Sequence, residues 1–398
     1  MIRMDLVPLR EIASVVRGVT FSKTEAFSEP AEGLLPVVRA GNIQDRLLLD
    51  DDLVYVPRAR IDEKQLLRQG DIVICTSSGS ADVVGKTAVV EEDWRGSFGA
   101  FCASIRAKPK KCDPRYLFYY LRSPAFRSWT QQSAGANIKN IRKSELDQFE
   151  VPLPDIAAQR RIAAILDKAD GIRRQREQAQ AMSDELLKST FLEMFGRPHH
   201  PNPALRVLPL GEICDLFAGN SLPPGEAYSG QDTGLLLLKV ADLNLPGNDQ
   251  IVTTAREWVS EKGSTRAAIV APKNAIVFPK RGGAIATNKK RVLGRPSVLD
   301  PNLMAVAPKK GAPITYPYLR MWFELLDLTS ISNGSTVPQL NKGDLHPLKM
   351  AVPERVTLAA FERVFQGVRH VRHKHAADTV CSEALFSTLS QRAFRGEL

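Results

Sequence analysis

The sequence predicts an α+β protein made of two tandem, related α/β domains joined by two long helices that form an antiparallel coiled coil. Three observations lead to this fold class. The 398-residue chain aligns with itself, short β-branched runs alternate with turns in each half, and each half ends in about 40 residues with helical spacing of apolar side chains. The hydrophobic content of 43% is sufficient for packed cores.

The two halves of the chain are related by an internal duplication. Residues 7–12 (VPLREI) recur as residues 208–213 (LPLGEI). Beyond residue 135 the halves align without a gap, at an offset of 199 that matches Ile141 with Leu340. Apolar positions repeat, whereas surface positions do not. One fold has therefore been used twice with different surfaces.

Each copy begins with a mixed segment of strands and turns. Strands are expected where β-branched runs lie between clusters of Gly, Ser and Asp, at residues 34–39, 71–76, 86–90 and 101–105. Asp113 and Pro114 supply an N-cap and a first-turn proline for a short helix at 116–121. The matching helix in the second copy is expected at 318–323.

A long helix is expected at the end of each copy. About 40 helical residues form a rod of roughly 60 Å, which a small domain cannot bury alone. We therefore expect the two rods to pack against each other, antiparallel. In the alternative arrangement, each helix lies on its own domain. The residues expected to line the seam are Ile162, Ile165, Ala169, Ile172, Leu186, Phe361, Phe365, Val368, Val371 and Leu385.

Domain boundaries follow from these changes of pattern. Prolines and paired histidines after Gly196 end the first helix and form an extended linker. The expected organisation is a first domain at residues 1–153, a long helix at 154–196, a linker at 197–204, a second domain at 205–353 and a second long helix at 354–398.

Composition indicates the compartment and the class of partner. The net charge is +10 and the pI is about 9.4, which favours a polyanion such as nucleic acid. No apolar run approaches the roughly 18–20 residues that cross a bilayer, and the start has no secretory signal pattern. Five scattered cysteines fit a reducing environment. We expect a cytoplasmic protein without a membrane segment.

Sequence signatures of catalysis and of metal binding are missing. Residues 79–87 resemble a phosphate-binding loop, but five residues instead of four separate the two glycines. His370, His373 and His375 would fall on different faces of a helix. We therefore expect a chain that is not an enzyme, with no catalytic residue, no metal ligand and no cofactor of its own.

Basic and polar loops differ between the two copies. Lys280 and Arg281 precede two glycines, and four polar or basic residues follow at 288–291, whereas the first copy has Ser77 and Ser78 at the corresponding place. Lysine and arginine neutralise phosphates, and variable polar side chains read base edges. The candidate DNA-binding residues are Arg39, Asn42, Ser77, Ser78, Lys86, Asn137, Lys139, Arg142, Lys143, Lys239, Lys280, Arg281, Asn288, Lys289, Lys290, Arg291, Gln339 and Lys342.

The whole chain resembles the DNA specificity subunit of type I restriction-modification enzymes. The resemblance lies in the order of domains and helices, and in the openings at 7–12 and 208–213. It also lies in Pro152-Leu153-Pro154 with residues 159–166 (QRRIAAIL), and in helix ends at 191–196 and 393–398. The second copy departs from the pattern because Leu358 stands in the place of Gln159. That departure puts any contact of the glutamine in doubt there.

The resemblance implies what the chain does and what it binds. Each domain would be a target-recognition domain that reads one half of a bipartite sequence in double-stranded DNA. The helices would space the domains and dock two modification (methyltransferase) subunits. S-adenosylmethionine, ATP and Mg would be held by partner subunits, including a restriction or motor subunit. Two other functions remain open: the specificity subunit of an adenine methyltransferase system without a nuclease, and a non-specific DNA-bridging protein.

Overall fold

A computed structural model describes residues 3–80, 82–133, 139–260, 269–334 and 337–398, with side chains for all of them except 133, 139 and 373–380. The chain divides into two compact units. Unit 1 comprises Met1–Glu177 and Ala376–Leu398, and unit 2 comprises Gln178–His375. Each unit therefore contains a part of both long helices.

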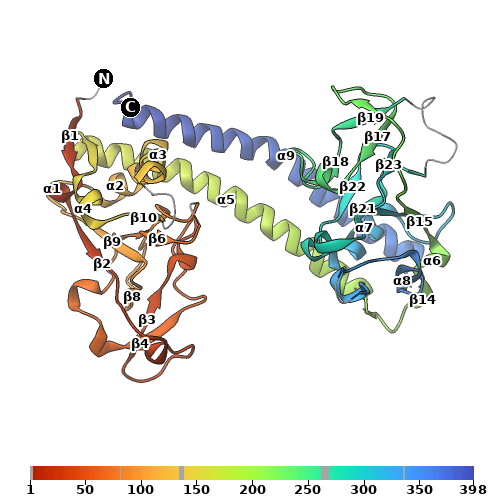
Figure 1. The fold of residues 1–398 in the computed structure, drawn as a ribbon, viewed down its shortest axis with the longest axis horizontal. Helices are drawn as coiled ribbons and strands as arrows, with labels where there is room; N and C mark the ends of the chain where they lie inside the picture. Colours follow the sequence, from red (N-terminus) through yellow and green to blue (C-terminus); the bar gives the residue numbers. More distant parts are fainter. Residues whose placement is uncertain (1–2, 81, 134–138, 261–268, 335–336) are drawn as a thin grey trace. The chain divides into compact units, whose positions relative to one another are not determined.

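Unit 1 is built on a four-stranded antiparallel sheet of order β2-β9-β5-β7 (Figure 1). Its strands are Ala13–Arg17, Cys102–Ala107, Ile72–Cys75 and Thr87–Val89. A second sheet has the order β4-β3-β8, with strands Val54–Pro57, Leu34–Val38 and Ser97–Phe98. Two-stranded pairs join β1 (Asp5–Pro8) to β11 (Glu150–Leu153), and β6 (Ser77–Ser78) to β10 (Lys139–Asn140).

Short helices cover the sheets of unit 1. Asp113 caps α2 as the sequence predicts, because its Oδ1 accepts the backbone N–H groups of Arg115 (2.9 Å) and Tyr116 (3.1 Å). The short α-helices are α1 (Leu9–Ile12), α2 (Pro114–Tyr120), α3 (Pro124–Ser133) and α4 (Lys143–Gln148). Single 3₁₀ turns lie at Lys23–Glu25, Ala40–Asn42, Arg58–Arg60 and Glu63–Gln65.

Unit 2 contains two five-stranded sheets. The first, β15-β24-β21-β22-β18, has strands Cys214–Ala218, Leu303–Pro308, Ile276–Pro279, Arg291–Leu293 and Ile251–Val252. The second, β16-β19-β17-β23-β20, has strands Glu226–Ala227, Glu257–Val259, Leu235–Leu238, Ser297–Leu299 and Val270–Ala271. Two further pairs join β12 (Gly196–Arg197) to β13 (His200–Pro201), and β14 (Arg206–Pro209) to β25 (Lys349–Val352).

The helices of unit 2 follow the same order as those of unit 1. They are α6 (Leu210–Ile213), α7 (Tyr316–Leu325) and α8 (Lys342–Leu345), with 3₁₀ segments at Val240–Asn244, Gly282–Thr287 (η7) and Thr329–Ile331. Among the described residues, no helix is both long enough and apolar enough to span a membrane.

The duplication is visible in buried hydrogen bonds as well as in the element order. The hydroxyl of Tyr116 donates to the carbonyl of Pro152 (2.5 Å), and that of Tyr318 donates to the carbonyl of Ala351 (2.7 Å). Both tyrosines are fully buried. Each therefore ties a short helix to the strand that precedes a long helix, in the same way in both units.

Two equivalent glycines allow close backbone contacts. A Cβ at Gly18 would lie 2.1 Å from the carbonyl oxygen of Gly99, and one at Gly219 would lie 1.8 Å from that of Asp300. Either approach is far too short for a side chain. The repeat of Gly18 as Gly219 in the sequence thus reflects a packing requirement that both units share.

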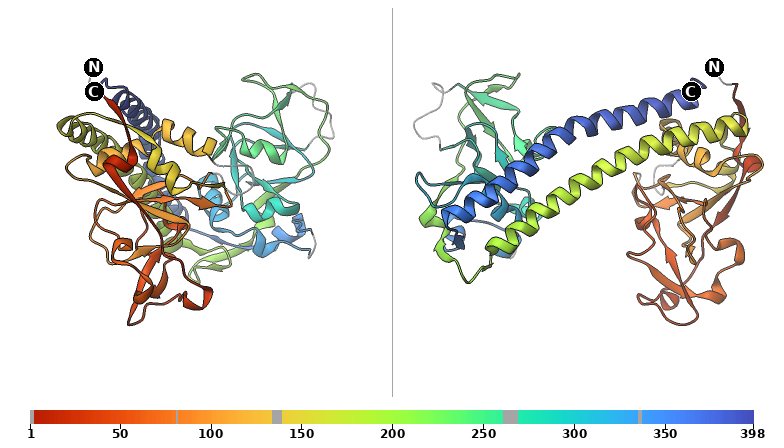
Figure 2. Two further views of the ribbon diagram at one scale, coloured as in Figure 1. Left: turned by 60° about the vertical axis from the view of Figure 1, so that its left-hand side comes forward. Right: turned by 180° about the vertical axis from the view of Figure 1, so that it is seen from behind.

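The long helices are α5 (Ile156–Phe195) and α9 (Arg355–Phe394), and they pack antiparallel within each unit (Figures 1 and 2). In unit 1, the beginning of α5 and the end of α9 join the core around Tyr116; in unit 2, the end of α5 and the beginning of α9 join the core around Tyr318. With two repeated α+β units joined by antiparallel long helices, the predicted fold class is confirmed.

Four predicted seam residues are not buried. Leu186 and Leu385 are 55% and 48% exposed, and Ile172 and Val371 are 36% and 40% exposed. For the first pair the prediction is wrong by one position. The inward side chains belong to Leu187, which is 3% exposed, and to Phe386, which packs against the core of unit 1. Where two apolar residues are adjacent, the sequence pattern does not show which of the two side chains faces the core. This ambiguity occurs in both copies.

The other predicted seam positions lie inward to different degrees. Ile165 is partly exposed. The remaining five are buried within the core of unit 1 or unit 2: Ile162, Ala169, Phe361, Phe365 and Val368.

The departure from the repeat at Gln159 and Leu358 has a structural consequence. Gln159 is buried; its Oε1 accepts the N–H of Asp113 (2.9 Å), and its Nε2 donates to the carbonyl of Pro154 (2.8 Å). Leu358 instead packs in the apolar core of unit 2. At this position of the repeat, α5 therefore makes polar contacts, whereas α9 makes apolar ones.

Candidate nucleic-acid interface

Two of the predicted DNA-binding loops meet in unit 1. Ser77 and Ser78, in β6, pair with Asn140 and Lys139 of β10. The N–H of Ile141 also donates to the carbonyl of Thr76 (2.8 Å). Asn137 lies outside the described residues, and the side chain of Lys139 is not among the described side chains. The two loops, which are about 60 residues apart in sequence, thus form one surface.

The equivalent loops meet in the same way in unit 2. Arg281 forms an antiparallel bridge with Gln339, and the N–H of Leu340 donates to the carbonyl of Lys280 (2.9 Å). Gln339 also donates through Nε2 to Oδ1 of Asn341 (2.9 Å). We call these paired loops, residues 76–78 with 139–143 and residues 280–282 with 338–342, the loop clusters of units 1 and 2.

A third loop, which was not predicted from the sequence, completes each loop cluster. The carbonyl of Phe101 accepts the N–H groups of Thr76 (2.9 Å) and Ser77 (3.1 Å), and the carbonyl of Asn302 accepts the N–H of Lys280 (2.7 Å). The Phe101 side chain is 68% exposed. The sequence signal for this loop was an aromatic residue that follows Gly-Ala in a turn. Packing in a buried strand would not leave a phenyl ring exposed, so the exposure of this ring indicates another role.

The two loop clusters carry their cationic side chains at different positions. In unit 2, Arg281 is exposed and Lys280 is partly buried; burial, and then the positive charge of Arg281, lower the pKa of the Lys280 ammonium. In unit 1 the corresponding backbone positions carry Thr76 and Ser77. The described cationic side chains of that cluster lie on the segment 139–143: Arg142 is exposed, and Lys143 pairs with Asp147 (2.9 Å).

The unit 2 cluster also has polar and cationic side chains on its segment 338–342. Lys342 is exposed in the first turn of α8, and Gln339 is partly exposed. In unit 1, Ser77 and Ser78 are also partly exposed. Each cluster thus combines groups that can neutralise phosphates with groups that can donate and accept hydrogen bonds.

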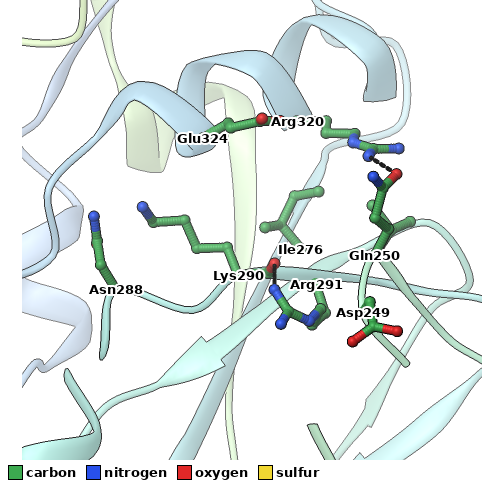
Figure 3. A pocket seen from close by; sticks show the side chains of 9 residues that line it. Asp249, Gln250, Ile276, Asn288, Lys290, Arg291, Arg320 and Glu324 are labelled. Carbon is green, nitrogen blue, oxygen red and sulfur yellow. Dashed lines mark hydrogen bonds between the residues drawn. The ribbon is translucent and has the colours of Figure 1, made fainter. Parts of the chain in front are cut away.

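The structure separates the basic run of unit 2 into two parts. η7 lies between Arg281 and Asn288, and Asn288 takes a left-handed conformation (φ 52°) at its end. Lys289 hydrogen-bonds Oδ1 of Asn244, and Lys290 donates to the carbonyl of Leu326. Burial lowers the pKa of Lys290 to about 8. Lys290 and Arg291 line a polar pocket (Figure 3) instead of extending the exposed loop.

Asn42 is a structural residue, which corrects its prediction as a DNA contact. Its side chain is 1% exposed; its Oδ1 accepts the N–H of Arg39 (2.7 Å), and its Nδ2 donates to the carbonyl of Asp51 (2.6 Å). The amide is therefore fully used in closing a 3₁₀ turn. Asp242 closes the equivalent turn by accepting the N–H of Lys239 (2.8 Å).

The cations beside these turns are exposed but paired. Arg39 forms an ion pair with Asp52 (2.6 Å), and Lys239 forms one with Glu257 (2.7 Å). The hydrogen bond to Glu257 raises the pKa of Lys239. Within the described part of the chain, no group of three or more His, Cys, Asp or Glu residues is placed to hold a metal ion. The side chains of His373 and His375 lie outside that part.

Comparison with known protein families identifies the first part of the chain. Residues 1–180 match the family described as type I restriction modification DNA specificity domain. Residues 1–180, slightly less than half of the chain, are thus similar to a type I restriction-modification DNA specificity domain. The matched residues contain the loop cluster of unit 1 and the beginning of α5.

Curated proteins that are similar to this chain are described as type I restriction enzyme specificity subunits. The chain is 39% identical over 161 residues to the StySPI specificity subunit of Salmonella potsdam and 37% identical over 163 residues to the EcoKI specificity subunit of Escherichia coli K12. These segments make up 40% and 41% of this chain. They span 35% of the length of each relative, about one third.

Solved structures extend the likeness in fold to the whole chain. One is described as "Structural basis underlying complex assembly and conformational transition of the type I R-M system"; it covers 100% of this chain and 98% of its own, with a TM-score of 0.52 and 20% identity. A type I restriction-modification S subunit from M. genitalium covers 99% and 96%, with a TM-score of 0.58 and 14% identity. At these identities, the likeness shows the fold alone.

Proposed function

We propose that the chain is the DNA specificity subunit of a type I restriction-modification system. Each unit binds one half of a bipartite sequence in double-stranded DNA through its loop cluster, and the chain itself is not an enzyme. The observation that carries this proposal is the pair of equivalent loop clusters with unlike side chains. Ser77 and Phe101 occupy positions in unit 1 that Arg281 and Asn302 occupy in unit 2.

The two loop clusters have equivalent backbone positions but different side chains, and this combination fits a protein that reads two different DNA sequences. Backbone and cationic groups fix the position of a protein on the phosphates, and polar side chains distinguish base edges. A protein that bridged DNA without regard to sequence would need two similar basic surfaces. Arg281 has a serine as its counterpart, so the observation favours two readers of different half-sites.

The long helices are proposed to space the two readers and to dock two methyltransferase subunits. Each helix contributes to the core of both units, so a change in its length would alter the distance between half-sites. In this proposal the partner subunits hold S-adenosylmethionine, Mg and ATP, and a restriction or motor subunit completes the system. The assembly acts in the cytoplasm, where the five free cysteines stay reduced.

Replacing Lys280 and Arg281 together by alanine tests the phosphate contacts of unit 2. We expect weaker binding to a duplex that carries both half-sites, and a slope of log affinity against log salt that is smaller by about 0.9 per lost phosphate contact. Binding is measured over a salt series with the assembled complex. Lys143→Ala with Arg142→Ala is the matched variant for unit 1. Unchanged affinity and slope would remove Lys280 and Arg281 from the interface.

Exchanging residues 1–150 for those of a related specificity subunit tests the division of labour. We expect one half of the recognised sequence to change and the other half to stay, because the loop cluster of unit 2 is untouched. Methylated adenines are mapped in a host genome with and without the exchange. A change in both halves would refute independent readers. Methylation without any restriction of foreign DNA would instead indicate a system that lacks a nuclease.

A further inference from the structure

Each unit contains a polar pocket at the same place in its fold. The pocket of unit 1 has a volume of about 540 Å³ and is lined by Asp45, Lys86, Arg122 and Arg127, among others. The pocket of unit 2 has a volume of about 290 Å³, and its lining includes three cationic side chains, Lys290, Arg291 and Arg320 (Figure 3). We call these the unit 1 and unit 2 pockets.

Strand register relates one wall of the two pockets. Ile72 pairs with Val89 in unit 1, and Ile276 pairs with Val292 in unit 2. In both units this strand begins shortly after a residue with positive φ, at Gly85 (80°) and Asn288 (52°), and that residue lines the pocket. By this register Gly85 and Thr87 correspond to Asn288 and Lys290, so the two pockets share this wall of the fold.

The cations of the unit 2 pocket are poorly neutralised by the protein. Asp249 and Glu324 also line the pocket, but Lys290, Arg291 and Arg320 donate to other groups: the carbonyl of Leu326, the carbonyl of Lys290 itself (3.0 Å) and Oε1 of Gln250 (3.0 Å). Burial lowers the pKa of Lys290 and that of Arg320. These positive charges are thus desolvated without a full set of anionic partners.

One guanidinium nitrogen in each pocket is buried without a hydrogen-bond partner in the described structure. It is Nε of Arg291 in unit 2 and Nη1 of Arg122 in unit 1. Arg122 uses Nη2 to reach Oδ1 of Asp45 (3.0 Å), while Arg127 donates to the carbonyls of Val84 and Asp82. A buried charged donor without an acceptor is costly, and each pocket holds one: Arg291 lies on β22 in unit 2, and Arg122 follows α2 in unit 1.

We propose that each pocket binds a phosphate group. A tetrahedral oxyanion offers several acceptor oxygens to the guanidinium and ammonium groups that line a pocket, and it would supply the acceptor that Arg122 and Arg291 lack. Cationic side chains outnumber carboxylates among the lining residues of both pockets. The phosphate belongs either to the backbone of bound DNA or to a free phosphate ester, because both offer the same oxygens.

Titration of the full chain with inorganic phosphate tests the proposal. We expect two sites per chain by calorimetry, one site in Arg291→Gln and one in Arg122→Gln, with affinity at each altered site reduced about tenfold or more. Arg256→Gln is the control, because its side chain is 63% exposed and lies outside both pockets. Arg291→Lys, which keeps the charge, should retain part of the affinity and guards against misfolding of the glutamine variant.

Two results separate the possible sources of the phosphate. Displacement of inorganic phosphate by a duplex of arbitrary sequence would identify the DNA backbone as the ligand. Retention of phosphate in the presence of that duplex would identify a free phosphate ester. The proposal is overturned if the chain does not bind millimolar phosphate, or if both glutamine variants bind it as the unaltered chain does. Inorganic phosphate needs no DNA, so this outcome and the failure of the proposed function are distinguishable.

Discussion

Asp170→Ala is expected to lower the free energy of unfolding of unit 1 by about 1.5–3 kcal/mol, because two partly buried guanidinium groups lose their most buried carboxylate. Arg173 keeps Asp45 and Glu177, and Arg174 keeps Glu91. Asp170, on α5, is 2% exposed. It accepts hydrogen bonds from Nε (3.0 Å) and Nη2 (2.9 Å) of Arg173, and it forms an ion pair with Arg174 (2.8 Å). The loss is measured by urea denaturation.

The control for this change is Glu177→Gln. Glu177 also pairs with Arg173 (2.7 Å), but its side chain is 42% exposed, and an exposed ion pair contributes at most about 1 kcal/mol. The two variants therefore remove a buried and an exposed carboxylate from the same arginine. If the two variants lose equal stability, Asp170 is not a buried anchor of α5.

Phe361→Ala is expected to destabilise unit 2 by about 3–5 kcal/mol, the usual cost of removing a buried phenyl ring. Phe361, on α9, is 0% exposed, and its ring centroid lies 5.4 Å from those of Phe191 and Phe195 on α5. The substitution opens a cavity at the contact between the two helices. Thermal and urea unfolding of unit 2 measure the loss.

Leu186→Ala is the matched control for the helix contact. Leu186 follows the apolar spacing of α5 yet is 55% exposed, so its truncation should change stability by no more than about 0.5 kcal/mol. Equal losses in Phe361→Ala and Leu186→Ala would mean that the apolar repeat, and not the observed burial, defines the contact between the helices.

The sequence was sufficient for the repeat and the element types, because both depend on local patterns. The cap at Asp113, for example, needs only its next three residues. Single side chains were harder. At Leu186-Leu187 and Leu385-Phe386, two adjacent apolar residues satisfy the same helical spacing, and only packing against a particular neighbour decides which one is buried.

The candidate site was predictable only in part. Both paired loops were found because polar and basic residues cluster in them. Asn42 was misread because an amide that closes a turn has the same sequence appearance as an amide that reads a base. Phe101 and Arg122 were missed because the third loop and the pockets form only when strands distant in sequence come together.

Unit 1 is built from two separate stretches of the chain, and this affects the order in which the chain can fold during synthesis. Unit 2 is a continuous stretch, Gln178–His375, and can reach its native contacts as soon as it leaves the ribosome. Unit 1 must wait for Ala376–Leu398, whose Phe386 and Phe394 rings pack against Tyr119 and Tyr116. The half that is translated first is therefore completed last, and its aromatic surface stays open to chaperones until residues 376–398 have left the ribosome.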